Sequence, residues 1–437
     1  MGIKVAKFGG TSLADASQFR KVKSIIDLDK DRRFIVNSAP GKRFSEDIKV
    51  TDMLYQCKRN LSDEQLFQAS MEKVFQRFSD IIDQLGVDLD LEPILKEIEE
   101  KIREGASDDY TASRGEYLNG RIMAAYLGYD FVDPSEIIKF TPDKKLDPEK
   151  TYALATARLK DCKAAVIPGF YGSDSAGEIV TFSRGGSDIT GAIVAKAVQA
   201  DVYENWTDVS GMLAADPRIV KDPKPIAMIS YKELRELASM GASVLHEDAV
   251  YPAKEAGIPI NIRNTNRPED SGTYVDKNIA PGASSNEPAG IAGKKGFSFL
   301  HISGGNVDSR ADRMETLFSI LAPLNLQVKS VKCNAGMISV LVQGDMTEEQ
   351  VEDTQRKIAD DFGAEKVKWN NNIALIAVVG DGLNKESALA KTATALSKAG
   401  IPMVLAAVNA LQSPVVGVFE EDLERGLQSI YQELYRA

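Results

Sequence analysis

The segment from Lys7 to Ser12 reads KFGGTS and places a cation, two glycines and two hydroxyls within six residues. It follows an apolar run that starts at Ile3, so we expect Lys7 at the end of a strand, with a helix opening after the glycines. Glycine lets the backbone approach a phosphate, and the first N–H groups of a helix attract anions. A purely structural turn is the alternative, and the spacing is not GxxxxGK[ST]. The pattern predicts that Lys7 faces a transferred phosphoryl group beside Gly9 and Gly10.

A second glycine turn, from Ser183 to Asp188, reads SRGGSD and repeats this design before a helix expected over residues 189–199. Asp188 suits the first turn of that helix, and the glycines suit a tight turn. Neither feature explains Arg184, whose guanidinium is a ready partner for a carboxylate or a phosphate. The turn therefore predicts a second anion site.

Three further segments carry polar groups. The segments WTDVSG, from Trp206 to Gly211, and ADPR, ending at Arg218, either only form loops or contact a nucleotide. Glu116 comes at the start of a helix expected over residues 117–127, where a lone carboxylate can simply favour the helix dipole.

The elements that must position these groups form a parallel α/β pattern over the first 290 residues. Apolar runs predict strands at 3–8, 34–36, 164–167, 178–182 and 200–206, and amphipathic spacing predicts helix over 63–104. Residues 276–290 are rich in Pro, Gly, Ser and Asn and indicate a linker. Beyond it, 297–370 and 371–437 repeat a strand–helix–strand–strand–helix order with a period of about 75 residues, which is the ferredoxin-like plan.

Composition narrows the classes of function. The chain has 437 residues and a formal charge of −11, and no basic patch that would favour nucleic acid. No apolar run reaches the roughly 18 residues of a membrane span, and the N-terminus lacks a signal-peptide pattern. The three scattered cysteines indicate free thiols in a reducing cytoplasm and not disulfides. Two histidines offer little for a histidine-based metal centre or a Ser-His-Asp triad.

Eight segments resemble, in order, those of the aspartate kinases of the amino-acid-kinase superfamily. They are Lys7 to Ser12, Ser113 to Glu116, Gly169 with Phe170, Arg184 to Asp188, Trp206 to Gly211, Ala215 to Arg218, Gly241-Ala242 with Val244 to His246, and Ile262 to Thr265.

The resemblance implies a three-layer α/β/α kinase domain over 1–290 and two ACT regulatory domains over 297–370 and 371–437. It implies transfer of the γ-phosphate of MgATP to L-aspartate, giving 4-phospho-L-aspartate and ADP. It also implies a homodimer or dimer of dimers, and lysine or threonine as effector. The roles it implies are γ-phosphate contact for Lys7 and orientation of Lys7 by Asp188, which would also help hold the substrate ammonium. Arg184 would grip the α-carboxylate, Thr51, Glu116 and Ser187 would complete the aspartate site, and Thr207, Asp208 and Arg218 would serve the nucleotide.

The chain departs from that pattern at several positions, among them Glu247 after His246, the run from Ala406 to Asn409, and three that carry ligand contacts in relatives. Ser243 stands where many relatives carry a nucleotide-binding lysine, and Leu213 where a tyrosine usually lies near the adenine. Lys329 replaces an aspartate of lysine-inhibited relatives, and a cation there would repel a lysine side chain. Two alternatives stay open: a relative acting on glutamate, acetylglutamate or a nucleoside monophosphate, and an amino-acid sensor with little catalysis.

Overall fold

The computed structural model describes residues 2–242, 245, 247–277, 287–304, 307, 310–334, 336–344, 346–408 and 413–435. Ser243 and most of the expected linker lie outside the described residues. The chain forms two compact units. The first comprises residues 1–212, 225–238 and 243–279, and the second comprises 213–224, 239–242 and 280–437.

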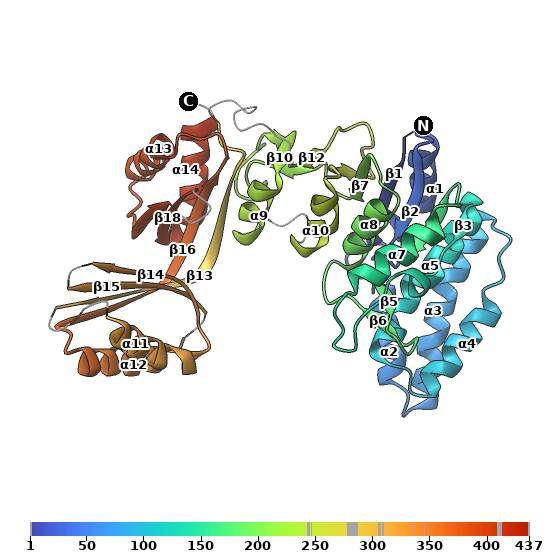
Figure 1. The fold of residues 1–437 in the computed structure, drawn as a ribbon, viewed down its shortest axis with the longest axis horizontal. Helices are drawn as coiled ribbons and strands as arrows, with labels where there is room; N and C mark the ends of the chain where they lie inside the picture. The colour runs from blue at the N-terminus through green and yellow to red at the C-terminus, as the bar shows by residue number, and fades with distance from the viewer. Residues whose placement is uncertain are drawn as a thin grey trace. The chain divides into compact units, whose positions relative to one another are not determined.

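The first unit is built on an eight-stranded sheet in the order β10-β12-β11-β7-β1-β2-β4-β3 (Figure 1). Its neighbouring strands pair in parallel except β11 with β12. The strands are β1 (Lys4–Phe8), β2 (Arg32–Asn37), β3 (Asp130–Phe131), β4 (Ala165–Pro168), β7 (Val202–Thr207), β10 (Met228–Ser230), β11 (Ile260–Asn264) and β12 (Thr273–Asp276). Short strands lie outside it: β5 (Tyr171–Ser173), β6 (Ile179–Thr181), β8 (Met212–Leu213) and β9 (Pro225–Ile226).

Helices cover both faces of this sheet and complete three layers, as the sequence predicted. One layer holds α7 (Pro148–Leu159), α8 (Gly186–Ala197) and α10 (Glu247–Ala256), with α8 against β1 and β7. The other holds α1 (Ala16–Asp27), α2 (Val50–Arg59), α3 (Glu64–Leu85), α4 (Glu92–Arg103) and α5 (Asp108–Leu127) around one apolar core. The remaining helices are η1 (Gly10–Leu13), α6 (Pro134–Ile137) and α9 (Tyr231–Ser239). No helix of the described residues is both long and apolar enough to cross a bilayer.

Helix α8 runs from Gly186 to Ala197, within three residues of the expected 189–199, and two other predicted helices differ more from the observed ones. The span predicted as helix over 63–104 is broken after Leu85, because Gly86 adopts a left-handed conformation that ends α3. Helix α5 begins at Asp108, nine residues before the predicted start, because the Ser107 hydroxyl accepts from the Tyr110 N–H and caps it. Glu116 therefore lies in the middle of α5, and its interpretation as a partner of the helix dipole is wrong.

The second unit contains a six-stranded antiparallel sheet in the order β14-β15-β13-β16-β18-β17. Its strands are β13 (Gly290–Ser303), β14 (Gln327–Asn334), β15 (Met337–Gln343), β16 (Lys366–Val379), β17 (Leu405–Val408) and β18 (Pro414–Phe419). Its helices are α11 (Ala311–Leu321), η2 (Ala322–Leu324), α12 (Glu348–Phe362), α13 (Lys385–Lys398), η3 (Glu420–Asp422) and α14 (Leu423–Tyr435). Figure 1 shows α11 and α12 together beside β14 and β15. This is the repeated ferredoxin-like plan that the sequence predicted.

The two repeats share their central strands. The end of β13, from Phe297 to Ser303, pairs with β15 and with the start of β16. The start of β13, residues 290–294, pairs instead with residues 375–379 of β16. The repeat that contains α11 and α12 is therefore nested inside the repeat that contains α13 and α14.

Residues 213–224 fold with this second unit, although they lie within the sequence of the first. The Ile291 N–H donates to the Ala214 carbonyl at 2.7 Å. The Gln428 amide on α14 donates to the Ile219 carbonyl at 2.8 Å, and the Lys224 N–H donates to the buried Tyr431 hydroxyl at 2.9 Å. The segment that carries Arg218 is thus hydrogen-bonded to the C-terminal helix α14.

Candidate active site

Several predicted residues meet at the carboxyl edge of the first unit's sheet, where parallel strands present their loops. The register places Lys7 of β1 beside Asn205 of β7, and Phe8 between Trp206 and Asn37. Side chains alternate along a strand, so neighbouring positions face opposite layers. Phe8 and Trp206 enter the apolar core, whereas Lys7 and Asn205 face α8.

Lys7 forms an ion pair with Asp188 in the first turn of α8. The Lys7 Nζ lies 2.6 Å from the Asp188 Oδ1, and the two side chains are only 10% and 19% exposed. The Asn205 amide donates to the same oxygen at 2.7 Å, and the buried Tyr203 hydroxyl donates to the Asp188 carbonyl at 3.1 Å. Because Asp188 is itself held by these two residues, it fixes the direction of Lys7 before any ligand binds.

The turn after β1 leaves backbone donors open. The Gly9 N–H donates to the Trp206 carbonyl at 3.0 Å, and the Ser12 N–H donates to the Gly9 carbonyl at 3.0 Å. Within the described part of the chain, no carbonyl accepts from the N–H of Gly10 or Thr11. A Cβ on Gly9 would lie 3.9 Å from the Lys7 Nζ, so the turn and the lysine border one space. Two free N–H groups beside a cation suit a phosphate.

Glu116 lies beside this turn and is buried. Its carboxylate accepts from the Ala39 N–H, and its Oε2 has no hydrogen-bond partner among the described residues. The Asn37 amide donates to the Glu116 backbone carbonyl at 2.9 Å. Burial raises the pKa of the Glu116 carboxyl to about 8. An unpartnered buried acceptor of this kind fits a cationic ligand group better than a structural role.

Ser187 and Thr51 lie on the elements that border Glu116 and Lys7. A Cβ on Gly169 would lie 2.6 Å from the Ser187 Cβ, so the end of β4 packs closely on the start of α8. Thr51 is the second residue of α2, which packs on α5. Both side chains are partly exposed. They flank the carboxyl edge, and neither forms a hydrogen bond to Lys7 or Glu116 within the described part of the chain.

Arg184 lies in the turn before α8 and is exposed. The turn closes at Gly185, whose φ of 58° is a left-handed conformation that favours glycine. Arg184 forms no ion pair or hydrogen bond within the described residues.

The three nucleotide candidates do not share one unit. Thr207 ends β7 in the first unit and Asp208 follows it. The Asp208 carboxylate accepts from the Thr11 hydroxyl at 3.4 Å and from the Thr207 hydroxyl at 3.3 Å. Arg218 belongs to the second unit. Its side chain is 87% exposed, and its guanidinium pairs with Asp216 at 2.6 Å. The structure therefore places two of the three beside the turn after β1.

The described residues offer no built metal site. They contain no cluster of three or more Asp, Glu, His or Cys side chains that could hold an ion. Mg²⁺ in kinases is held by one or two carboxylates together with substrate phosphates and waters, so this composition fits an ion that arrives on a nucleotide. The exposed Asp208 carboxylate beside Thr11 is an oxygen ligand available to such an ion.

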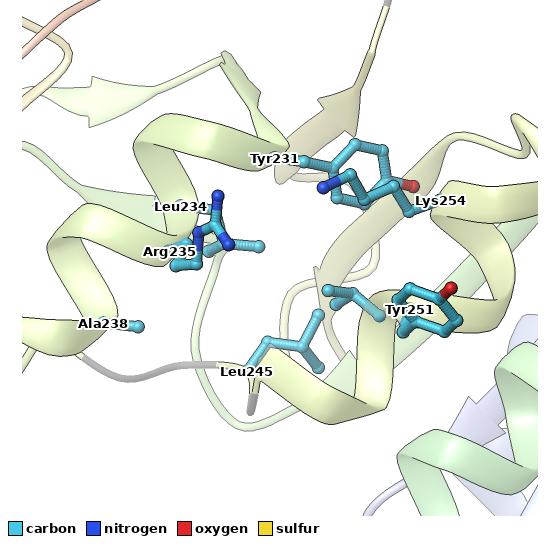
Figure 2. A pocket seen from close by; sticks show the side chains of 8 residues that line it. Tyr231, Leu234, Arg235, Ala238, Leu245, Tyr251 and Lys254 are labelled. Atoms are coloured by element: carbon cyan, nitrogen blue, oxygen red, sulfur yellow. The ribbon is translucent and has the colours of Figure 1, made fainter. Parts of the chain in front are cut away.

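A cavity of about 140 Å³ lies elsewhere in the first unit, between α9 and α10 (Figure 2). Leu234, Ala238, Leu245 and Val250 line it, and Arg235 and Lys254 extend toward it in the view. None of the predicted site residues lines this cavity. The carboxyl edge of the sheet therefore remains the candidate site.

The sequence patterns missed several residues of the site. Asn205 and Tyr203 hold Asp188, and Asn37 holds the backbone beside Glu116. A signal existed for the two asparagines, because each is a polar residue within or at the end of a buried apolar strand. No such signal marks Tyr203, whose role depends on the packing of α8.

Comparisons with known proteins agree with this geometry. Residues 2–264 match the family described as "Amino acid kinase family". The chain is 33% identical to aspartokinase 3 of Bacillus subtilis, with 99% of each chain covered. The structure superposes on the Clostridium acetobutylicum aspartate kinase with a TM-score of 0.91 and 42% identity, covering 99% and 100% of the chains. Escherichia coli aspartokinase III, at 23% identity, shares the fold: its complex with aspartate and ADP gives a TM-score of 0.71, covering 99% and 100%. Its complex with lysine and aspartate gives 0.74, covering 99% of each chain.

Proposed function

The chain belongs to the amino acid kinase family and, within it, to the aspartokinases, and from this premise we propose that it transfers the γ-phosphate of ATP to the side-chain carboxylate of L-aspartate. The products are 4-phospho-L-aspartate and ADP. The observation that carries the proposal is the nearly buried Lys7–Asp188 pair beside two backbone N–H groups that no described carbonyl accepts.

The reaction needs charge placement more than proton transfer. An aspartate carboxylate is already ionised near neutral pH, so its oxygen can attack the γ-phosphorus without a general base. The bond to the bridging oxygen breaks, and ADP carries the electron pair away. Lys7 neutralises the oxygens of the moving phosphoryl group, and the N–H groups of Gly10 and Thr11 orient the phosphates. Asp188 holds the direction of Lys7 and, with its carboxylate, helps receive the substrate ammonium.

The substrate's two other charges need partners of opposite sign. Arg184, which lacks a protein partner among the described residues, receives the α-carboxylate. Glu116 receives the ammonium, and Thr51 and Ser187 complete the aspartate site with their hydroxyls. Because Glu116 must be ionised to do this, aspartate binding displaces its proton.

The nucleotide lies along the turn after β1. Gly9 and Gly10 line the phosphates, Thr207 and Asp208 serve the nucleoside end, and Arg218 adds a cation for the phosphates. Mg²⁺ would reach the site with ATP, the Asp208 carboxylate would help hold it, and it would neutralise part of the phosphate charge.

Regulation and assembly follow from the second unit. Its paired ferredoxin-like repeats would bind an amino-acid effector, lysine or threonine, and join two chains into a homodimer or a dimer of dimers in the cytoplasm. Lys329 lies on the exposed edge strand β14 and its ammonium donates to Gln327 at 2.7 Å. A cation at this position favours threonine over lysine as the effector, because it repels the side-chain ammonium of lysine.

ADP release tests the proposal directly. We expect Mg²⁺-dependent release with aspartate and none above background with glutamate or without an amino acid. Repeating the assay with lysine and then threonine identifies the effector. Folded protein that binds ATP but shows no aspartate-dependent release would contradict the proposal and favour a sensor.

A further inference from the structure

A buried ion pair lies behind the turn after β1, on the side away from Lys7. The Arg77 guanidinium on α3 pairs with Asp47 at 2.9 Å, and the two side chains are 2% and 5% exposed. Arg43 also binds the Asp47 carboxylate through its side chain and its N–H. These hydrogen bonds hold the pKa of Asp47 well below its usual range despite burial, and the bond from the Arg43 side chain contributes most. Asp47 is therefore an anion at neutral pH, and Arg77 is held against it.

Arg77 also fixes one backbone position. Its Nη2 donates to the Gly41 carbonyl at 2.7 Å, and the Gly41 N–H donates to the Gly10 carbonyl at 2.8 Å. The contact is tight: a Cβ on Gly41 would lie 2.6 Å from the Gly10 carbonyl carbon, and one on Gly10 would lie 2.9 Å from the Ala39 carbonyl. Gly41 can therefore shift little without moving Gly10.

The planarity of the peptide carries this restraint into the site. The Gly10 carbonyl and the Thr11 N–H belong to one trans peptide, so they point in opposite directions. With the carbonyl held by Gly41, the Thr11 N–H must point to the opposite side, where no carbonyl of the described residues accepts it. We propose that Arg77 and Asp47 form a positioning pair that aims the Thr11 N–H at the nucleotide phosphates.

This inference rests on the proposed function, because it assumes that the turn binds phosphate. Neither residue touches substrate. Arg77→Met removes both bonds of the guanidinium, whereas Arg77→Lys can keep the charge beside Asp47 but cannot bind Asp47 and Gly41 as a planar fork does. Phe67→Leu is the matched control, because Phe67 is buried on the same helix α3, three turns away.

The test measures the ADP dissociation constant by calorimetry, the Michaelis constants for ATP and aspartate, and the melting temperature. We expect Arg77→Met to weaken ADP binding and to raise the ATP KM about tenfold, with the aspartate KM within about twofold, since one charge-assisted restraint is lost. Arg77→Lys should fall between Arg77→Met and the wild type. Phe67→Leu should lower the melting temperature and leave ADP binding unchanged.

Wild-type ADP binding is read first, since its absence would refute the proposed function and not the positioning role alone. If both Arg77 variants lower the melting temperature but bind ADP as the wild type does, the pair is structural only and the inference fails. It also fails if Phe67→Leu weakens ADP binding as much as Arg77→Lys does. Should Arg77→Met not fold, Arg77→Lys alone decides between these outcomes.

Discussion

Lys7 lies on β1, and Arg184 lies in the turn before α8, the helix whose Asp188 pairs with Lys7. The surroundings of these two cations are opposite. Lys7 is nearly buried, and Asp188 with its own partner Asn205 holds it in place. Arg184 is exposed and has no partner among the described residues. A charge that stabilises a transition state works best when it is already placed, because no reorganisation is then needed during the reaction. A charge that recognises substrate is better left without a competing protein anion.

Removing the placed charge should have the largest effect. We expect Lys7→Ala to lower kcat by at least about 100-fold through loss of transition-state stabilisation, measured as aspartate-dependent ADP release. Lys4→Ala is a suitable control, because Lys4 lies on the same strand and pairs with Asp29 at 2.7 Å, away from the carboxyl edge. Near-normal turnover in Lys7→Ala with an unchanged circular dichroism spectrum would end the proposed role of Lys7.

Removing the unpartnered charge should instead weaken recognition. We expect Arg184→Ala to raise the aspartate KM about tenfold or more, with kcat within about threefold, because a charge-assisted hydrogen bond is worth about 1.5–3 kcal/mol. Arg184→Lys should recover part of the loss, since it keeps the charge without the planar fork. An unchanged aspartate KM in both variants would remove Arg184 from the carboxylate site.

Glu116 sharpens the comparison, because it is buried like Lys7 and its Oε2, like Arg184, has no partner among the described residues. Its folded pKa of about 8 lies above the ordinary 4.5, so the folded state binds more protons between these values. Stability should therefore fall as pH rises from 4.5 to about 8, by up to about 1.4 kcal/mol per pH unit, and Glu116→Gln should lose this fall. Melting temperatures measured across that range check it. Saturating aspartate should flatten the wild-type curve, and parallel curves for the two proteins would contradict the pKa shift.

We expect the smallest effect from Arg218, which is far more exposed than Lys7. Arg218 pairs with Asp216 on the surface, and exposed pairs contribute at most about 1 kcal/mol. We expect Arg218→Ala to raise the ATP KM about fivefold at most and to leave the aspartate KM unchanged. A loss as large as that of Lys7→Ala would mean that Arg218 is buried against the phosphates when ATP binds.

Features set by residues close in sequence could be predicted, whereas contacts between residues far apart in sequence could not. Local signals located the glycine turns, the strands that end at them and the repeat, because turns and periodicity are properties of neighbouring residues. The start of α5 was missed, although Ser107 followed by two aspartates is a recognisable cap. The Arg77–Asp47 pair could not be found in advance, because it joins α3 to a loop through a contact that depends on how α3 packs.

The nested repeats of the second unit affect how the chain can be cut and rejoined. Phe297 of β13 and Ile373 of β16 are register partners on adjacent strands. The inner repeat, which lies between them in sequence, therefore begins and ends at neighbouring positions of the outer repeat. Truncation at residue 371 would strip the outer repeat of everything but its first strand. Excision of the inner repeat, with a tight turn joining the two strands, would leave the outer repeat's strand pairs intact. In topological terms the inner repeat is an insertion into the outer one, so its removal would retain α14, the helix that binds residues 213–224.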